Sequence, residues 1–218
     1  MAKHAMQAED KVARKGVILK AARELYEADP RNLPSVASIA QRSNLAKGTI
    51  YIYFKTKEAI FAELLFKERL EIFDVMQSAF HDQTKTPQEC IKLMIKSFMS
   101  RFVDNIYFMR LDSIGYTILE PNMELEQFVT EKQALFEKLV SAGNVVDSFF
   151  SLPSGKGTNL LARSYALSKG MWQVTDVPDH FQKGTSEQIF EDFRIGFIHG
   201  VSEALMDYWS GALKIDLN

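Results

Sequence analysis

Cysteine, long apolar runs and strand-like alternation are all scarce in this sequence of 218 residues. Cys90 is the only cysteine, which excludes an internal disulfide and any metal site built from several cysteines. No apolar run reaches the length of about 18 residues that a membrane helix needs. The start, MAKHAMQAEDKVARKG, also lacks the apolar core of a signal peptide. We therefore expect neither a membrane span nor secretion, and place the protein in the cytoplasm.

Catalytic and metal-binding patterns are missing as well. The segment SGKGT, Ser154 to Thr158, lacks the preceding strand and the glycine spacing of a phosphate-binding loop, and we expect it to be a flexible loop. No nucleophile or zinc pattern involves the four histidines, which are His4, His81, His180 and His199. The sequence therefore predicts no enzyme, no metal site and no cofactor.

Helical periodicity, in contrast, runs through almost the whole chain. Apolar positions recur at helical spacing, and proline, glycine and asparagine mark the turns between segments. The pattern predicts an all-α fold of about nine helices, four of them N-terminal. One is a long helix from Thr56 to about Phe80, free of proline and glycine. The expected segments are 12–28, 36–43, 47–54, 56–80, 88–103, 104–119, 123–150, 158–175 and 186–210.

Charge is divided unevenly along the chain. Residues 1–60 contain 11 Lys and Arg against 6 Asp and Glu, a net charge of +5, whereas residues 61–218 contain 15 against 22, a net charge of −7. A basic N-terminal part on an acidic remainder is typical of nucleic-acid binding confined to the N-terminus.

The segment SNLAKGTIYIYFKTKE, Ser43 to Glu58, indicates a helix-turn-helix. Ser35 is a plausible N-cap for the preceding helix. Asn44 suits the left-handed residue that a tight corner requires. In the next helix Ile50 and Phe54 form a buried face, which leaves Lys47 at a helix start that would face phosphates.

The stretch SVASIAQRSNLAKGTIYIYFKTKEAIFAELL, Ser35 to Leu65, resembles the DNA-binding signature of the tetracycline-repressor (TetR) family of bacterial transcription regulators. The resemblance covers roughly residues 11–65. It implies a DNA-binding head, residues 1–55, and a ligand-binding and dimerisation body, residues 56–218. It further implies a homodimer on a palindromic double-stranded operator. Asn44, Ala46 and Ile52 depart from the family pattern of glycine, a serine cap and a second tyrosine. Ile52 could make an apolar contact with a sugar or a thymine methyl instead.

The resemblance assigns DNA contacts residue by residue. Ser35 would bind a phosphate, and Lys57 another. The helix after the turn would contact the major groove and backbone through Lys47, Gly48, Thr49, Tyr51 and Tyr53. Arg42 is a further candidate. Simpler roles stay open, because the tyrosines could cap a small core and Arg42 and Lys57 could be ordinary solvated cations.

Methionine and aromatic residues gather in the first segments of the body. Such adaptable side chains could line an apolar ligand cavity between helices, or could form only the core. We expect a largely apolar small-molecule effector, bound by Met94, Phe98, Phe102, Tyr107, Arg110, Asp112 and Tyr116.

Small residues recur every four positions in the last two segments, which predicts shallow helix grooves. We expect a dimer interface there, although the same grooves could pack within one protomer. Its residues are Ala162, Ala166, Gly170, Gly196, Gly200 and Ala204. The sequence thus predicts a DNA-binding regulator, a repressor of nearby genes released by its effector. The alternative is a helical interaction scaffold that has lost DNA binding.

Overall fold

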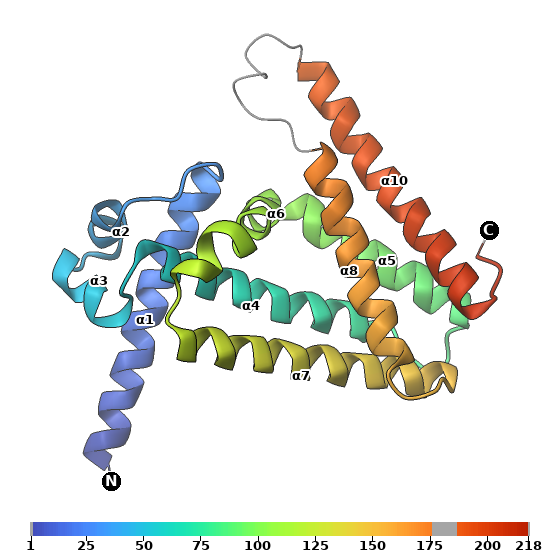
Figure 1. Cartoon of the computed structure of the whole chain (residues 1–218), viewed down its shortest axis with the longest axis horizontal. Coiled ribbons are helices and arrows are strands. Elements are labelled where there is room, and N and C mark those ends of the chain that lie inside the picture. The colour runs from blue at the N-terminus through green and yellow to red at the C-terminus, as the bar shows by residue number, and fades with distance from the viewer. Residues whose placement is uncertain (1, 176–186, 218) are drawn as a thin grey trace. The chain divides into compact units, whose positions relative to one another are not determined.

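All regular structure in the described part of the chain is helical, as expected. The computed structural model describes the backbone of residues 2–175 and 187–217, and the side chains of residues 10–174 and 195–217. These residues form two compact units (Figure 1). Unit 1 consists of Met1–Glu68 and Ile106–Glu131, and unit 2 of Arg69–Asn105 and Lys132–Asn218.

The first three helices of unit 1 are α1 (Ala2–Ala28), α2 (Val36–Ser43) and α3 (Lys47–Tyr53). Helix α1 begins at Ala2, earlier than the start predicted near Val12. Helix α2 contacts both of its neighbours. The three helices enclose a small core of apolar side chains at helical spacing, namely Ile18, Leu19, Ala22, Tyr26, Val36, Ile39, Ile50 and Phe54.

Unit 1 also contains a segment from the middle of the chain. It comprises α6 (Ile106–Ser113), a π-helical turn (Gly115–Leu119), a 3-10 turn (Glu120–Asn122) and the start of α7 (Leu125–Phe150). The segment expected to be one helix near 104–119 is therefore helical in two pieces. The break falls at Ile114, just before Gly115, a poor helix former, and Pro121 then lacks the N–H that a continuing helix would use.

Helix α4 (Lys57–Ser78) realises the long helix that the sequence predicts, and the division between the units falls within it, after Glu68. The predicted functional boundary lies earlier, at residues 55 and 56. That boundary concerns which residues bind DNA rather than which residues are compact together, and it stays a prediction.

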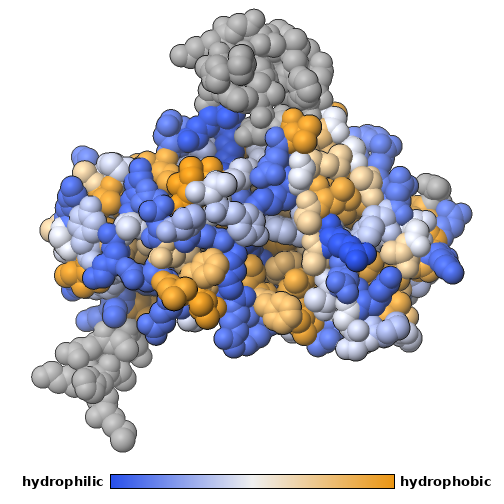
Figure 2. Space-filling view, viewed as in Figure 1, coloured by the Kyte–Doolittle hydropathy of each residue, from blue (hydrophilic) through white to orange (hydrophobic). Residues whose placement is uncertain are grey.

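Unit 2 contains α5 (Pro87–Asp104), most of α7, α8 (Lys156–Thr175) and α10 (Glu187–Leu213). Helix α10 contacts both α5 and α8. The fully buried Trp209 donates its indole N–H to Ser164 Oγ at 2.9 Å and stacks on Phe80, with ring centroids 5.8 Å apart. On the face drawn in Figure 2, hydrophobic and hydrophilic residues are interspersed.

Helices α7 and α8 approach closely where they join. A Cβ on Gly143 would lie 2.3 Å from Thr158 Oγ1, so only glycine fits there. Asp147 accepts hydrogen bonds from the N–H groups of Gly155, at 2.8 Å, and Gly157. The expectation of a flexible loop at SGKGT is therefore wrong, because α8 begins at Lys156 and this buried carboxylate fixes its first turn.

Candidate nucleic-acid interface

The N-terminus of α2 is capped as predicted. Ser35 has extended backbone angles (φ −70°, ψ 153°), and its Oγ accepts the N–H of Ser38 at 3.1 Å. The Ser38 hydroxyl in turn donates to the Ser35 carbonyl at 2.8 Å. Ser35 itself is exposed. The local sequence therefore sets where α2 starts and leaves that end open to a phosphate.

The turn between α2 and α3 depends on Asn44. This residue has left-handed backbone angles (φ 54°, ψ 41°), as expected. The Leu45 N–H then reaches back to the Ala40 carbonyl at 2.9 Å, a helix-ending bond of the Schellman type. Asparagine thus does here what glycine usually does, and the corner stays tight.

Helix α3 presents two different faces. Ile50 and Phe54 are buried, 0% and 3% exposed, and hold the helix against the rest of the head. The opposite face is open. Lys47, Gly48, Tyr51 and Ile52 are exposed, while Thr49 and Tyr53 are partly buried. No side chain caps the N-terminus at Ala46, so the first N–H groups of α3 lack that partner.

Arg42 and Lys57 differ in their surroundings. The Arg42 guanidinium pairs with Glu24 of α1, with N–O distances of 2.6 and 2.8 Å. Lys57, in the first turn of α4, has only a 4.0 Å approach to Glu58 among the described ion pairs. Arg42 therefore has a structural role in joining α2 to α1, whereas the partly buried Lys57 makes no such close pair among the described residues.

All eight predicted DNA-contacting residues lie in unit 1, on α2, on α3 or beside them. Ser35 precedes α2, Arg42 is near its C-terminus, and Lys57 starts α4. Ile52, which stands where the family has a second tyrosine, is the most exposed apolar residue of α3 at 70%. Its position two residues after the buried Ile50 is the sequence signal for this exposure, because successive helix residues turn by about 100°.

A buried polar cluster lies elsewhere in unit 1. The Tyr107 hydroxyl of α6 donates to the Glu68 carboxylate of α4, and the Arg23 guanidinium of α1 lies 3.3 Å from the same carboxylate. Arg23 also lies over the Tyr107 ring, 5.0 Å from its centroid. Burial, together with this hydrogen bond to a carboxylate, raises the pKa of Tyr107 well above its usual range. The Tyr107 hydroxyl expected to orient an effector is thus already bonded to Glu68.

The seven expected effector-binding residues divide between the two units. Met94, Phe98 and Phe102 are buried on α5 in unit 2. Tyr107, Arg110 and Asp112 belong to α6 in unit 1, and Tyr116, which is 55% exposed, to the following π-helical turn. Their joint role at a ligand stays a prediction.

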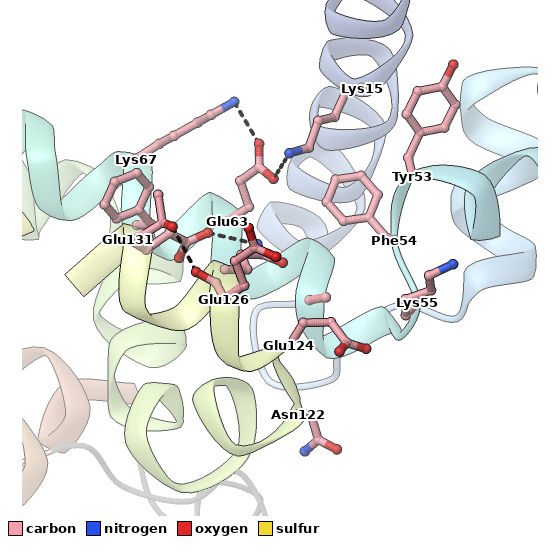
Figure 3. A pocket seen from close by; sticks show the side chains of 14 residues that line it. Lys15, Tyr53, Phe54, Lys55, Glu63, Lys67, Asn122, Glu124, Glu126 and Glu131 are labelled. Atoms are coloured by element: carbon pink, nitrogen blue, oxygen red, sulfur yellow. Dashed lines mark hydrogen bonds and ion pairs between the residues drawn. The ribbon is translucent and has the colours of Figure 1, made fainter. Parts of the chain in front are cut away.

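An open pocket of about 580 Å³ lies within unit 1 (Figure 3). Its lining is strongly charged and contains none of those seven residues. Glu63, which is 8% exposed, pairs with Lys15 and lies 3.6 Å from Lys67. Burial raises the pKa of Glu131 on the α7 side. The expected effector-binding residues therefore do not form this pocket.

The small-residue stripes of α8 and α10 lie toward the surface of unit 2. Ala166, Gly170 and Gly196 are exposed, and Ala162, Gly200 and Ala204 are partly buried. A Cβ on Gly170 or Gly196 would meet no described atom within 4 Å. Contacts with the described residues of the same protomer therefore do not explain why these two positions are glycine.

Among the described side chains, those of residues 10–174 and 195–217, no three His, Cys, Asp or Glu gather as a metal site would require. No described helix combines the length and apolar character needed to cross a membrane.

A helix-turn-helix head followed by helices of a second unit defines a class, the DNA-binding transcription regulators. The sequence profile of bacterial regulatory proteins of the tetR family matches residues 18–64, and that of the tetracyclin repressor-like C-terminal domain matches residues 67–215. The chain therefore belongs to the tetracycline-repressor (TetR) family, whose members are transcription regulators rather than enzymes.

A relative of known name matches part of the chain. The fatty acid metabolism regulator protein of Bacillus subtilis (strain 168) is 29% identical over 114 residues, which is 52% of this chain and 57% of that protein. The match thus spans little more than half of that relative.

Two solved structures share the fold. A tetR-family transcriptional regulator from Streptomyces coelicolor has a TM-score of 0.52 at 13% identity, covering 93% of this chain and 87% of that one. FadR from Bacillus subtilis, in complex with stearoyl-CoA, has a TM-score of 0.50 at 18% identity, covering 87% and 96%.

Proposed function

We propose that this regulator represses genes near its own by binding a palindromic operator as a homodimer, and that a largely apolar small molecule releases it. The observation that carries the proposal is the open face of α3. That helix is anchored by Ile50 and Phe54 and turns Lys47, Gly48 and Tyr51 outward. Because operator DNA lies in the bacterial cytoplasm, we place its action there.

The charges of the head favour DNA over a protein partner. Residues 1–60 have a net charge of +5, whereas the rest of the chain is acidic. Lys47 sits where the positive end of α3 disfavours a cation, and nearby phosphates would remove that disadvantage. The eight DNA-contacting residues named above then have distinct tasks, with the cations on phosphates and the outward face of α3 in the major groove.

A homodimer follows from the need for specificity. One seven-residue helix reaches few base pairs, while a two-fold pair reads two half-sites. The stripes of α8 and α10 support an interface there, because their glycines leave surface at which another helix could approach closely. The six residues from Ala162 to Ala204 named above are the proposed contacts.

For the effector we propose a compound whose apolar part is a long acyl chain, and a long-chain acyl thioester is the first such compound to test. The support is twofold. The Bacillus subtilis relative is named for fatty acid metabolism, and FadR has been solved with stearoyl-CoA. In this chain α5 supplies buried methionine and phenylalanine side chains, including Met94, Phe98 and Phe102, of the kind that accommodates an alkyl chain.

A mobility-shift assay with DNA from upstream of the protein's own gene tests the proposal. We expect a shifted band that unlabelled upstream DNA competes away and a scrambled duplex of equal composition does not. Addition of stearoyl-CoA should abolish the shifted band, because a ligand that releases DNA must bind the DNA-free state of the protein more tightly than the DNA-bound state. A chain that shifts neither duplex would be the helical scaffold instead. A complex unaffected by stearoyl-CoA would exclude this effector and leave DNA binding intact.

A further inference from the structure

Ile52 is an unusual residue for the outer side of a DNA-contacting helix. Its side chain is 70% exposed, compared with 42% for Tyr51, the other large apolar side chain exposed on α3. An isoleucine so exposed contributes little to the core of the head, so packing there does not require an apolar residue at this position.

Helix geometry places Ile52 at the outermost point of α3. It comes two positions after Ile50, a rotation of about 200°, so it lies opposite the buried anchor. Gly48 lies four residues earlier, on the same side, and a Cβ there would meet no described atom within 4 Å. Side chains of a helix lean toward its N-terminus, so the Ile52 side chain lies over Gly48, which has no side chain of its own.

We propose that Ile52 determines part of the operator sequence by contacting the C5-methyl group of a thymine in the major groove. The proposal rests on the proposed function, since it assumes that α3 enters that groove. The thymine methyl is the main apolar feature that base edges present there, and apolar side chains recognise it. Gly48 allows the helix backbone to come close enough for a side chain as short as isoleucine to reach the base edge.

The neighbouring side chains favour a base over a protein partner. Lys47 and Tyr51, both exposed, place a cation and a hydroxyl on the same helix as the isoleucine. A protein-docking surface would instead be expected to present several apolar residues together. A single apolar side chain, on a helix that also carries groups able to bind phosphate, matches a major groove in which a thymine methyl lies among polar base edges.

The test uses the full-length protein and the duplex that it selects from a random-sequence pool. Each thymine of that duplex is replaced in turn by deoxyuridine, which removes only the methyl group and keeps the base pair. Dissociation constants are measured by fluorescence anisotropy for wild type, Ile52→Ala and Ile52→Val. Leu93→Ala serves as the control, because Leu93 is also an exposed apolar residue but lies on α5.

We expect one deoxyuridine position in each half-site to weaken wild-type binding about fourfold, the value for one buried methyl group. Ile52→Ala should weaken binding to the thymine duplex and show no further loss with deoxyuridine, while Ile52→Val keeps part of the effect. Leu93→Ala should behave as wild type. If deoxyuridine weakened binding equally in wild type and Ile52→Ala, the inference would be overturned and the proposed function would stand. The same holds if no deoxyuridine substitution weakened binding. Failure to select any duplex would contradict both.

Discussion

Asn44 has the strictest backbone requirement in the head. Alanine in its left-handed conformation costs about 1 kcal/mol or more, whereas glycine adopts it freely. We therefore expect Asn44→Ala to lower the free energy of unfolding by about 1 kcal/mol, and Asn44→Gly to leave it within about 0.5 kcal/mol of wild type. Denaturant unfolding measures both. Gln41→Ala, an exposed change within α2, is the control, and an equal loss in all three variants would argue against the role of the turn.

Lys47 and Lys57 provide a second comparison between single residues. Lys57→Ala should weaken binding to all duplexes about uniformly and reduce the salt slope by about one, as expected for a lost phosphate contact. Lys47→Ala should also relax preference at one base position, by about 1–3 kcal/mol, if its side chain reaches a base edge.

Binding to the selected duplex and to single-base variants at several salt concentrations measures these effects. Lys92→Ala on α5 is the matched control, since that exposed lysine lies in unit 2. Equal, sequence-independent losses from Lys47→Ala and Lys57→Ala would exclude base reading by Lys47.

The raised pKa of Glu131 predicts that the stability of the protein depends on pH. Burial raises its pKa above the ordinary 4.5, with Glu63 and Glu120 acting in the same direction and Gln127 and Lys15 opposing them. A carboxyl with a raised folded pKa favours the folded state when protonated, and that contribution is lost as pH rises through the folded pKa. Glu131→Gln should therefore stabilise the protein at neutral pH and have little effect in acid.

Chemical unfolding at acid and neutral pH measures this difference. Glu126→Gln, which changes an exposed carboxylate one turn earlier on α7, is the control. A Glu131→Gln variant no more stable than wild type at neutral pH would contradict the burial argument.

At the scale of the element, the small-residue stripe of α10 predicts an effect on assembly. A Cβ at Gly196 would meet no described atom within 4 Å, and at Gly200 only Met171 Cε at 3.4 Å. Leucine at either position should thus leave the protomer folded but overpack a closely packed dimer by about 1–3 kcal/mol or more.

Light scattering and circular dichroism should then report folded monomers for Gly196→Leu and Gly200→Leu, with poor operator affinity. Gly16→Leu on α1 is the control, because its Cβ is equally unobstructed. Variants that remain dimeric would move the interface elsewhere.

The parts of the fold that local sequence determines were predicted well. The Ser35 cap, the left-handed Asn44 and the buried Ile50 each follow from residues within one or two turns. The break in the helix near Gly115 and the start of α8 at Lys156 were not predicted. The break has its signals in Gly115 and Pro121, which apolar periodicity alone does not take into account. The start of α8 depends on the hydrogen bonds that the buried Asp147 accepts from Gly155 and Gly157.

The same distinction holds for the candidate sites. The open face of α3 could be predicted because its anchors lie within the helix itself. The bond between Tyr107 and Glu68 could not, because it joins residues far apart in the sequence. Effector-binding residues depend on how several helices come together, so composition alone could only nominate them.

At the scale of the whole molecule, charge and symmetry make one joint prediction. The net positive charge lies in the first part of the chain, so DNA contacts should come from that part alone. A homodimer then presents two identical heads, and each should protect one half of a palindrome.

Hydroxyl-radical footprinting on the duplex that the protein selects tests this account most directly. We expect two protected stretches related by two-fold symmetry, with centres one or more helical turns apart on the same face of the DNA. Lys47→Ala should weaken both stretches equally. A single protected stretch, or uniform protection without preference for the selected sequence, would contradict the account of a dimer that reads DNA through α3.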